Sequence, residues 1–392
     1  MRYLFTITSI KEYGGMRCPL KWLLIYMLIN IDTTQVFCYS VVREQSDTCG
    51  LQDGCRLDQQ TGILNCKELD MRDIPRQTCP EVKHLDMRYN HLKRFSTGID
   101  DYYPNLKELD FGAAKITSVS LKVFENCSTL IKIFMNSNAI TNIEKDTFEG
   151  LTSLKYLYLS GNKLTRIQRK IFDPLNKTLL YLDHSHNKVQ KIQEKAFQEL
   201  SSLERLFLQN NRLTTINSGM LKGLKSLTHL YLSNNNITYV PHAAFKEMPL
   251  LHELKLGNNP GLISIHSGAL NHLAQLRFLD LMRTDISTLK NVSHLFSHNS
   301  QLTNFYIADT PLVCDESFKL WETWYERTKS DPLQTATCSE VPSEPMTTIT
   351  RRLSSEGMTY FNFLEEPNDA RQNRMQVLMI TAMTLLSLSL NT

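Results

Sequence analysis

Residues able to support catalysis or metal binding are few in this 392-residue chain, and the closest grouping is Asp183-His184-Ser185-His186. Histidines exchange protons near neutral pH and ligate transition metals, so two of them in one short segment could form part of a site. The sequence has no H-E-x-x-H, G-x-S-x-G or G-x-x-x-x-G-K-[ST] motif, the local signatures of zinc hydrolases, serine hydrolases and nucleotide-binding loops. We therefore predict that the protein is not an enzyme, has no catalytic or metal-ligating residues and uses no cofactor.

Nine cysteines are the other residues with distinctive chemistry. Their spacing lacks paired C-x-x-C units, so it favours disulfides in an oxidising compartment over zinc. Cys127 stands apart from the rest, and we expect a small buried hydrophobic residue there, with a reactive or intermolecular thiol as the alternative. The other eight fall near the ends of the chain: Cys18 and Cys38, then Cys49, Cys55, Cys66 and Cys79, and finally Cys314 and Cys338.

Charge and composition limit the classes of partner. The chain has 43 Lys and Arg against 40 Asp and Glu, a formal net charge of +3, which does not provide the dense positive surface of a nucleic-acid-binding protein. With 42% hydrophobic and 21% charged residues it is globular and able to bury a large core. We expect no nucleic-acid partner.

The N-terminal segment has the order of a secretory signal peptide. Lys11, Arg17 and Lys21 precede the apolar run 22–31, and Cys38 and Ser40 supply small residues before a cleavage point after Ser40. The sequence thus predicts a signal peptide at residues 1–40, with a second suitable start at position 16. The alternative is a retained signal-anchor helix, although the apolar run is shorter than the ~20 residues that span a bilayer.

The C-terminal tail, residues 375–392, is apolar up to Leu390 and has no basic residue after it. A transmembrane helix usually has basic residues on its cytoplasmic side, so the tail fits better a signal for glycosylphosphatidylinositol (GPI) attachment. We expect lipid attachment at Asn368, which places the protein on the extracellular face of the plasma membrane. A short single-pass helix and a secreted protein with a fortuitous apolar tail are the alternatives.

Between these ends the sequence repeats itself with a period close to 24 residues. The template L-x-x-L-x-L-x-x-N-x-L starts at Val82, Leu106, Leu130, Leu154, Leu179, Leu203, Leu227, Leu251, Leu276 and Leu302. One unit cannot bury its own hydrophobic residues, whereas stacked units place short strands side by side in a parallel sheet over a continuous core. In this register His184 takes a leucine position and His186 faces outward, so we expect an irregular core position there rather than a paired site.

Two further columns repeat with the leucines. An aromatic column includes Phe124, Phe148, Phe172, Phe197, Phe245 and Phe296, and an asparagine column comprises Asn90, Asn138, Asn162, Asn187, Asn211, Asn235 and Asn259. An inward asparagine offers donors and an acceptor, so it can satisfy backbone groups where the chain turns out of each strand. Ala114, Thr284 and Thr310 interrupt the asparagine column, and we expect looser turns at these three places.

These motifs resemble those of extracellular leucine-rich-repeat proteins with cysteine-rich N- and C-terminal flanks, the group of the Nogo receptor, Slit and the variable lymphocyte receptors. The resemblance covers residues 49–338 and implies an α/β-type solenoid, a leucine-rich-repeat horseshoe with a parallel concave sheet and disulfide caps. It also implies bridges Cys49–Cys55 and Cys66–Cys79, although four cysteines allow three connectivities. The C-terminal flank lacks the family's Cys-x-Cys, so we expect one bridge there, Cys314–Cys338, with Trp321 and Trp324 closing the open end.

The expected organisation follows from these segments. After the signal peptide come an N-terminal cysteine-rich cap at residues 49–81, ten leucine-rich repeats at 82–312, a C-terminal cap at 313–338, a polar stalk at 339–374 and the attachment signal at 375–392. Four N-x-S/T sequons agree with secretion and predict glycosylation at Asn126, Asn176, Asn236 and Asn291.

The binding surface is predicted from the outward residues of the strands, which lie between the leucines and face the concave side. The position before the second leucine gives His84, Glu108, Lys132, Tyr156, Tyr181, Arg205, His229, Glu253, Phe278 and Asn304. The position before the third leucine gives Asp86, Asp110, Phe134, Tyr158, Asp183, Phe207, Tyr231, Lys255, Asp280 and Tyr306. We expect one exposed aromatic and basic patch comprising Tyr156, Tyr158, Tyr181, Arg205, Phe207, His229 and Tyr231.

Tyrosine and arginine dominate protein-binding hot spots, so this patch predicts an extracellular protein ligand. The simpler interpretation is that strands favour aromatic residues, whose rings stack and stabilise the sheet. The function we expect is that of a cell-surface receptor or adhesion protein, with a signalling co-receptor if it signals. The alternative is a secreted extracellular-matrix repeat protein that binds matrix protein or glycan.

Overall fold

The computed structural model describes residues 49, 54–95, 98–298, 301–328 and 338–339. The chain divides into two compact units, residues 1–50 and 51–392, and every described helix and strand lies in the second. The predicted signal peptide, most of the stalk, Asn368 and the apolar tail lie outside the described residues. Among the described helices, none has the length and apolar character needed to cross a bilayer.

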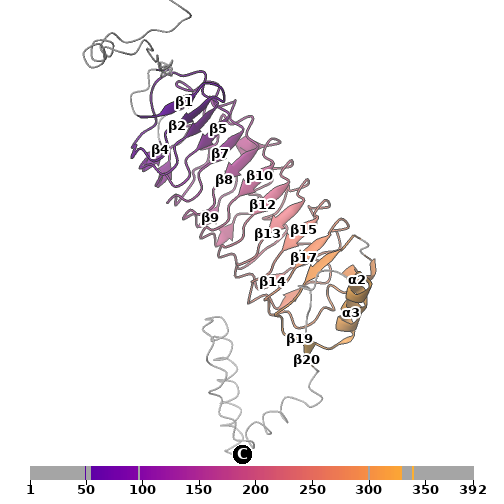
Figure 1. Cartoon of the computed structure of the whole chain (residues 1–392). Helices are drawn as coiled ribbons and strands as arrows, with labels where there is room; N and C mark the ends of the chain where they lie inside the picture. The colour runs from indigo at the N-terminus through magenta and orange to yellow at the C-terminus, as the bar shows by residue number, and fades with distance from the viewer. Residues whose placement is uncertain (1–48, 50–53, 96–97, 299–300, 329–337, 340–392) are drawn as a thin grey trace, which may run out of the picture. The chain divides into compact units, whose positions relative to one another are not determined.

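The second unit is a solenoid whose main element is a twelve-stranded sheet (Figure 1). Its strands, in spatial order, are β1 (Arg56–Asp58), β2 (Ile63–Asn65), β3 (His84–Asp86), β5 (Glu108–Asp110), β7 (Lys132–Phe134), β8 (Tyr156–Tyr158), β10 (Tyr181–Asp183), β12 (Arg205–Phe207), β13 (His229–Tyr231), β15 (Glu253–Lys255), β17 (Phe278–Asp280) and β18 (Asn304–Tyr306). Ten of them, from β3 onward, come one from each predicted repeat, so the predicted parallel-sheet solenoid is confirmed.

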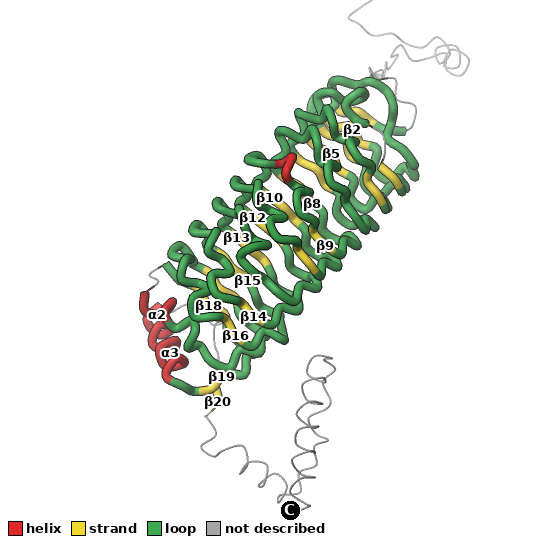
Figure 2. Tube along the Cα trace, turned by 180° about the vertical axis from the view of Figure 1, so that it is seen from behind, coloured by secondary structure: helices red, strands yellow, loops and turns green. Residues whose placement is uncertain are grey.

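Short strand pairs lie outside this sheet. They are β4 (Arg94–Phe95) with β6 (Ser118–Val119), β9 (Arg166–Ile167) with β11 (Lys191–Ile192), β14 (Tyr239–Val240) with β16 (Ser264–Ile265), and β19 (Leu312–Val313) with β20 (Cys338–Ser339). Loops and turns make up most of the chain between strands (Figure 2). The described helices are the turn η1 (Asp173–Leu175), α2 (His294–His298) and α3 (Glu316–Thr328).

The register of the large sheet follows directly from the leucine spacing. Leu157, Leu182 and Leu206 are Cα partners in adjacent strands, and all three side chains are fully buried. The residues on either side of each central leucine face the opposite side of the sheet, as the two-residue alternation of a strand requires. The interior behind the leucines contains the aromatic column, in which the Phe148 and Phe197 rings each lie 6.0 Å from that of Phe172.

The asparagine column acts as predicted. The Asn138 side chain accepts a hydrogen bond at Oδ1 from the Ile116 N–H (2.9 Å) and donates from Nδ2 to the Phe111 carbonyl (2.8 Å) and the Met135 carbonyl (3.1 Å). The equivalent asparagines from Asn162 to Asn259 repeat this pattern. Each amide therefore joins its own turn to the preceding one.

At the interruptions of this column no side-chain hydrogen bond joins neighbouring turns among those the structure describes. Thr284 Oγ1 donates to the Leu281 carbonyl (2.8 Å) and Thr310 Oγ1 to the Ile307 carbonyl (2.6 Å), both within the same turn. At Ala114 the backbone carbonyl itself accepts the hydrogen bond from the Leu92 N–H (3.0 Å). Whether these turns are looser stays a prediction.

The N-terminal flank extends the sheet by two strands, β1 and β2. β2 pairs parallel with β3, and β1 turns back antiparallel on β2, so a hairpin covers the edge of the first repeat. Cys55 is bonded to Cys66, so the expected pairing of Cys49 with Cys55 and of Cys66 with Cys79 is wrong. The spacing gave no reason to choose the pairing, whereas in the structure the Cα atoms of Cys55 and Cys66 are 4.4 Å apart, within disulfide reach.

The C-terminal flank closes the other end. Cys314 is bonded to Cys338, as expected. Trp321 and Trp324, both on α3, are buried, and the Trp324 ring lies 6.4 Å from that of Phe305 in β18, the last strand of the sheet. These side chains cover the core that the last repeat would otherwise leave open.

Candidate functional site

The seven predicted binding residues come from four consecutive strands, β8, β10, β12 and β13. The parallel register aligns Tyr156, Tyr181, Arg205 and His229 in one column and Tyr158, Asp183, Phe207 and Tyr231 in the next. All of them flank buried leucines and therefore lie on the outward side of the twelve-stranded sheet, which we call the sheet face. The structure thus brings the predicted residues together.

The aromatic residues of the sheet face stack into a continuous row. Ring centroids are 4.8 Å apart for Tyr158 and Tyr181, 4.8 Å for Tyr181 and Phe207, and 4.7 Å for Phe207 and Tyr231. Tyr181 belongs to the other column, but its ring fills the gap that Asp183 leaves between Tyr158 and Phe207. The row therefore crosses from one column to the other and back.

This row is longer than the sequence patch. Phe134 stacks on Tyr158 at 4.5 Å, and at the other end Lys255 Nζ lies 4.8 Å from the Tyr231 ring centroid and 5.1 Å from that of Phe278. Phe278 in turn lies 4.9 Å from Tyr306. We call the whole set the aromatic ladder: Phe134, Tyr158, Tyr181, Phe207, Tyr231, Lys255, Phe278 and Tyr306. The patch predicted from the sequence left out Phe134, Lys255, Phe278 and Tyr306, although the position columns contain them. Lys255 separates Phe278 and Tyr306 from the aromatic run, whereas Phe134 directly precedes Tyr158 in its column.

The patch is less exposed than the sequence predicts. Of the seven predicted residues, Arg205 is exposed and the other six are half-buried. Stacked rings cover one another's faces, and such pairs stabilise by roughly 0.5–1.5 kcal/mol beyond the area they bury. The ladder therefore stabilises the sheet and still presents ring edges and hydroxyl groups to solvent.

Charged pairs flank the ladder at both ends. Lys132 Nζ lies 2.7 Å from Glu108 Oε1, and Arg88 lies between Asp86 (2.6 Å) and Asp110 (3.4 Å). Toward the C-terminal end, Glu253 lies 2.9 Å from Lys255 Nζ and 3.6 Å from His229 Nε2. Most of the charge on the sheet face is thus compensated within the face.

Burial also sets the protonation of the ladder. It raises the pKa of Tyr181 and of Tyr231 to about 12, so both hydroxyls remain protonated donors throughout the physiological range. The same cause lowers the pKa of His229, in spite of the nearby Glu253. Near neutral pH the centre of the sheet face therefore offers the neutral hydroxyls of Tyr181 and Tyr231 beside the Arg205 and Asp183 side chains.

The two histidines of the segment 183–186 diverge, as expected. His184 is buried and its Nδ1 has no hydrogen-bond partner, whereas His186 is exposed and its Nε2 lies 3.1 Å from Asn210 Nδ2. Burial lowers the pKa of His184 to about 4, so the ring is neutral in the folded protein. The pair does not form a proton-transfer or metal site.

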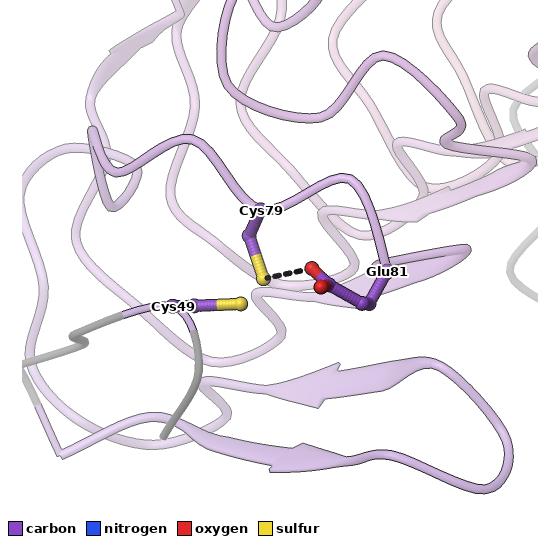
Figure 3. Close-up of side chains that lie close together, drawn as sticks. All are labelled: Cys49, Cys79 and Glu81. Carbon is purple, nitrogen blue, oxygen red and sulfur yellow. Dashed lines mark hydrogen bonds between the residues drawn. The ribbon is translucent and has the colours of Figure 1, made fainter. Parts of the chain in front are cut away.

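The cysteines offer no reactive thiolate in the part of the chain that the structure describes. Cys127 is free and buried, as expected, and burial raises the pKa of its thiol to about 12. Cys49 and Cys79 are both disulfide-bonded, and Cys79 Sγ lies 3.7 Å from Glu81 Oε2 (Figure 3). Since disulfide sulfur does not replace thiolate as a zinc ligand, the residues drawn in Figure 3 do not make a zinc site.

The four sequon asparagines lie outside the strands of the large sheet. Asn126, Asn176 and Asn236 are exposed, and Asn291 is half-buried. Asn126 Nδ2 donates to Asp100 Oδ2 (2.9 Å), a bond that glycosylation would alter. Glycosylation at all four stays a prediction.

Comparison with known proteins supports the fold. The leucine-rich-repeat family profile matches residues 104–164, 128–186, 177–237 and 227–286. No curated protein matches the chain. Similar solved structures include a chain of the TLR13–ssRNA13 complex, which has 22% identity and a TM-score of 0.51. The match covers 60% of this chain and 40% of that chain.

The second structure is the octameric complex of latrophilin 3 (Lec, Olf), Unc5D (Ig, Ig2, TSP1) and FLRT2 (LRR). The match has 20% identity and a TM-score of 0.52, and covers 75% of this chain and 94% of that chain. At these identities the similarity concerns the fold.

Proposed function

The chain is a leucine-rich-repeat protein with cysteine-containing flanks, and we propose on that premise that it binds an extracellular protein through its sheet face. The observation that carries the proposal is the aromatic ladder with Arg205 beside it, a continuous row of half-buried rings on the outward side of the sheet. Tyrosine and arginine at the centre of a rigid surface are the residue types enriched in protein-binding hot spots. A rigid scaffold also keeps the entropy cost of binding low.

A protein ligand fits this face better than a nucleic acid. The solved TLR13 structure contains single-stranded RNA and the FLRT2 structure contains protein partners, so the fold accommodates both. Here Arg88, Lys132 and Lys255 each lie against a carboxylate, which reduces the positive charge available to phosphates. Neutral tyrosine hydroxyls and ring edges suit a polypeptide surface instead.

The cellular setting is part of the proposal. The cysteine-containing flanks and the signal-like segment 1–40 support the secretory pathway, and the apolar tail behind Asn368 supports a lipid anchor on the cell surface. Release of the protein from intact cells by phosphatidylinositol-specific phospholipase C is the expected result, and retention on the cells after treatment would contradict the anchor. A secreted matrix protein, the alternative, would be recovered from the medium without that treatment.

The binding proposal is tested by a proximity-labelling screen on living cells with the full chain and with the triple variant Tyr158→Ala, Phe207→Ala, Tyr231→Ala. Proteins labelled by the wild type and lost with the triple variant are the expected ligands. Because these rings also stabilise the sheet, the single variant Arg205→Ala, an exposed side chain, is screened beside Arg212→Ala, an exposed arginine outside the strands. Labelling that survives the triple variant and Arg205→Ala alike would remove the sheet face as the binding surface.

A further inference from the structure

A polar surface cavity of about 460 Å³, largely open to solvent, lies beside the short strands β14 and β16, outside the twelve-stranded sheet. Its lining includes His242, His266 and Lys290, and every lining residue is polar or glycine and none is acidic. Small-ligand sites usually occupy roughly 300–1,000 Å³ and are mostly apolar. The size fits a small ligand, and the lining fits one rich in oxygen acceptors.

The repeat itself assembles the basic side of this cavity. His242, His266 and Lys290 come from three successive repeats, one or two residues after the inward side chains Val240, Ile265 and Leu289. The rings of His242 and His266 are perpendicular with centroids 5.0 Å apart. Gly268 makes room for them, since a Cβ there would lie 2.6 Å from His242 Cδ2. The stacking of repeats therefore brings these three side chains to the same cavity.

His266 presents a donor rather than a metal ligand. The Gly268 N–H donates to His266 Nδ1 (3.0 Å), which occupies the lone pair of that nitrogen. In the neutral ring the proton then lies on Nε2, so neither nitrogen of His266 has a free lone pair for a metal ion. Its Nε2–H can donate to a ligand oxygen.

We propose that this cavity binds an anionic sugar, one that carries a sulfate or a carboxylate. Lys290 supplies the positive charge and His266 an N–H donor, while the Asn271 amide and the Ser267 hydroxyl hydrogen-bond to sugar hydroxyls. The cavity is larger than a bare inorganic anion needs, and its amide and hydroxyl groups suit a ligand with several hydroxyl groups.

Two sources can supply this sugar. One is a free or partner-borne acidic glycan. The other is the glycan of the chain itself, because Asn291, the acceptor of the sequon Asn291-Val292-Ser293, lines the same cavity. The site lies on other strands than the aromatic ladder, so the inference is independent of the protein-binding proposal.

The test titrates the full chain, produced in animal cells, with a sulfated disaccharide and with its unsulfated counterpart by calorimetry. We expect the sulfated form alone to bind measurably, and the substitutions Lys290→Met and His266→Phe each to weaken binding by about tenfold. The matched controls are Lys246→Met and His272→Phe, exposed residues outside the cavity, which should leave the affinity within about twofold of the wild type.

The same titration with Asn291→Gln separates the two sources. If a free glycan is the ligand, the wild type and Asn291→Gln both bind the sulfated disaccharide; if the attached glycan fills the cavity, Asn291→Gln alone binds it. The inference is overturned when neither protein binds, when the sulfated and unsulfated sugars bind equally, or when the controls weaken binding as much as Lys290→Met does.

Discussion

His184 is a titratable residue in a position that the repeats give to leucine. The equivalent side chains before and after it are Leu159 and Leu208, both fully buried, and His184 is 2% exposed. Its Nδ1 has no partner, and an unsatisfied buried polar atom costs about 1–3 kcal/mol. Histidine at this position therefore lowers the free energy of unfolding relative to leucine.

The first prediction concerns the pH dependence of that cost. The folded pKa of about 4 lies below the unfolded value of about 6.5, so the ring is neutral in both states above pH ~6.5. As the pH falls toward 4, the unfolded state binds a proton that the folded state does not, and the free energy of unfolding decreases. We expect the wild type to lose on the order of 2 kcal/mol between pH 8 and pH 5 through this residue. The variant His184→Leu should lack this loss and should melt at a higher temperature at both pH values.

Thermal unfolding of both proteins at pH 8 and pH 5 measures this difference. His186→Leu, at the exposed neighbouring histidine, is the control and should keep the pH dependence of the wild type. An unchanged melting temperature for His184→Leu at pH 5 would show that the buried ring costs nothing.

The asparagine column is the element that joins successive turns. Asn211 accepts a hydrogen bond from the Val189 N–H (3.0 Å) and donates to the carbonyls of His184 (3.0 Å) and Leu208 (3.0 Å). Thr284, at the same position of a later turn, makes a single bond within its own turn. The two positions thus differ in how strongly they couple neighbouring repeats.

The second prediction compares truncations at these two positions. Asn211→Ala leaves buried backbone groups without partners and should cost about 3 kcal/mol, whereas Thr284→Ala should cost about 1 kcal/mol. Urea unfolding followed by circular dichroism gives both values. Equal losses for the two variants would contradict the role of the amide as the link between turns.

These elements show what the sequence could predict and what it could not. The 24-residue period set the strand register from Leu157 to Leu206 and the hydrogen bonds of Asn138, because a parallel stack allows one alignment of the leucines. The turn of the Tyr181 ring into the gap at Asp183 depends on side-chain packing, which spacing does not specify. The Cys55–Cys66 pairing and the β1–β2 hairpin depend on how the flank folds back on itself, outside the repeat.

At the scale of the whole molecule, each repeat contacts its neighbours, so stability is distributed along one axis and the ends are the vulnerable points. The C-terminal end depends on Cys314–Cys338 and on the tryptophans of α3 that cover Phe305. We therefore expect that loss of the Cys314–Cys338 disulfide destabilises the C-terminal repeats and leaves the central repeats unchanged.

The third prediction is that Cys314→Ala with Cys338→Ala removes about 3 kcal/mol of stability, from the entropy of the loop that the 24-residue separation closes. Hydrogen exchange should accelerate in α3 and β18 while β8 to β13 keep their protection. A uniform rise of exchange along the solenoid would contradict the local role of the cap.

The central claim is that the sheet face binds the protein ligand, and a glycan placed on that face tests it most directly. The substitutions Arg205→Asn and Phe207→Thr create an acceptor sequon in β12, at the centre of the aromatic ladder. The matched control, Lys191→Asn with Gln193→Thr, places a glycan at the exposed end of β11, outside the large sheet.

The measurement is the equilibrium affinity of each glycosylated variant for the ligand obtained from the cell-surface screen. The sheet-face glycan should abolish binding, and the β11 glycan should leave the dissociation constant within about twofold of the wild type. Full binding by the variant with a glycan in β12 would show that the ligand binds elsewhere and that the aromatic ladder only stabilises the sheet.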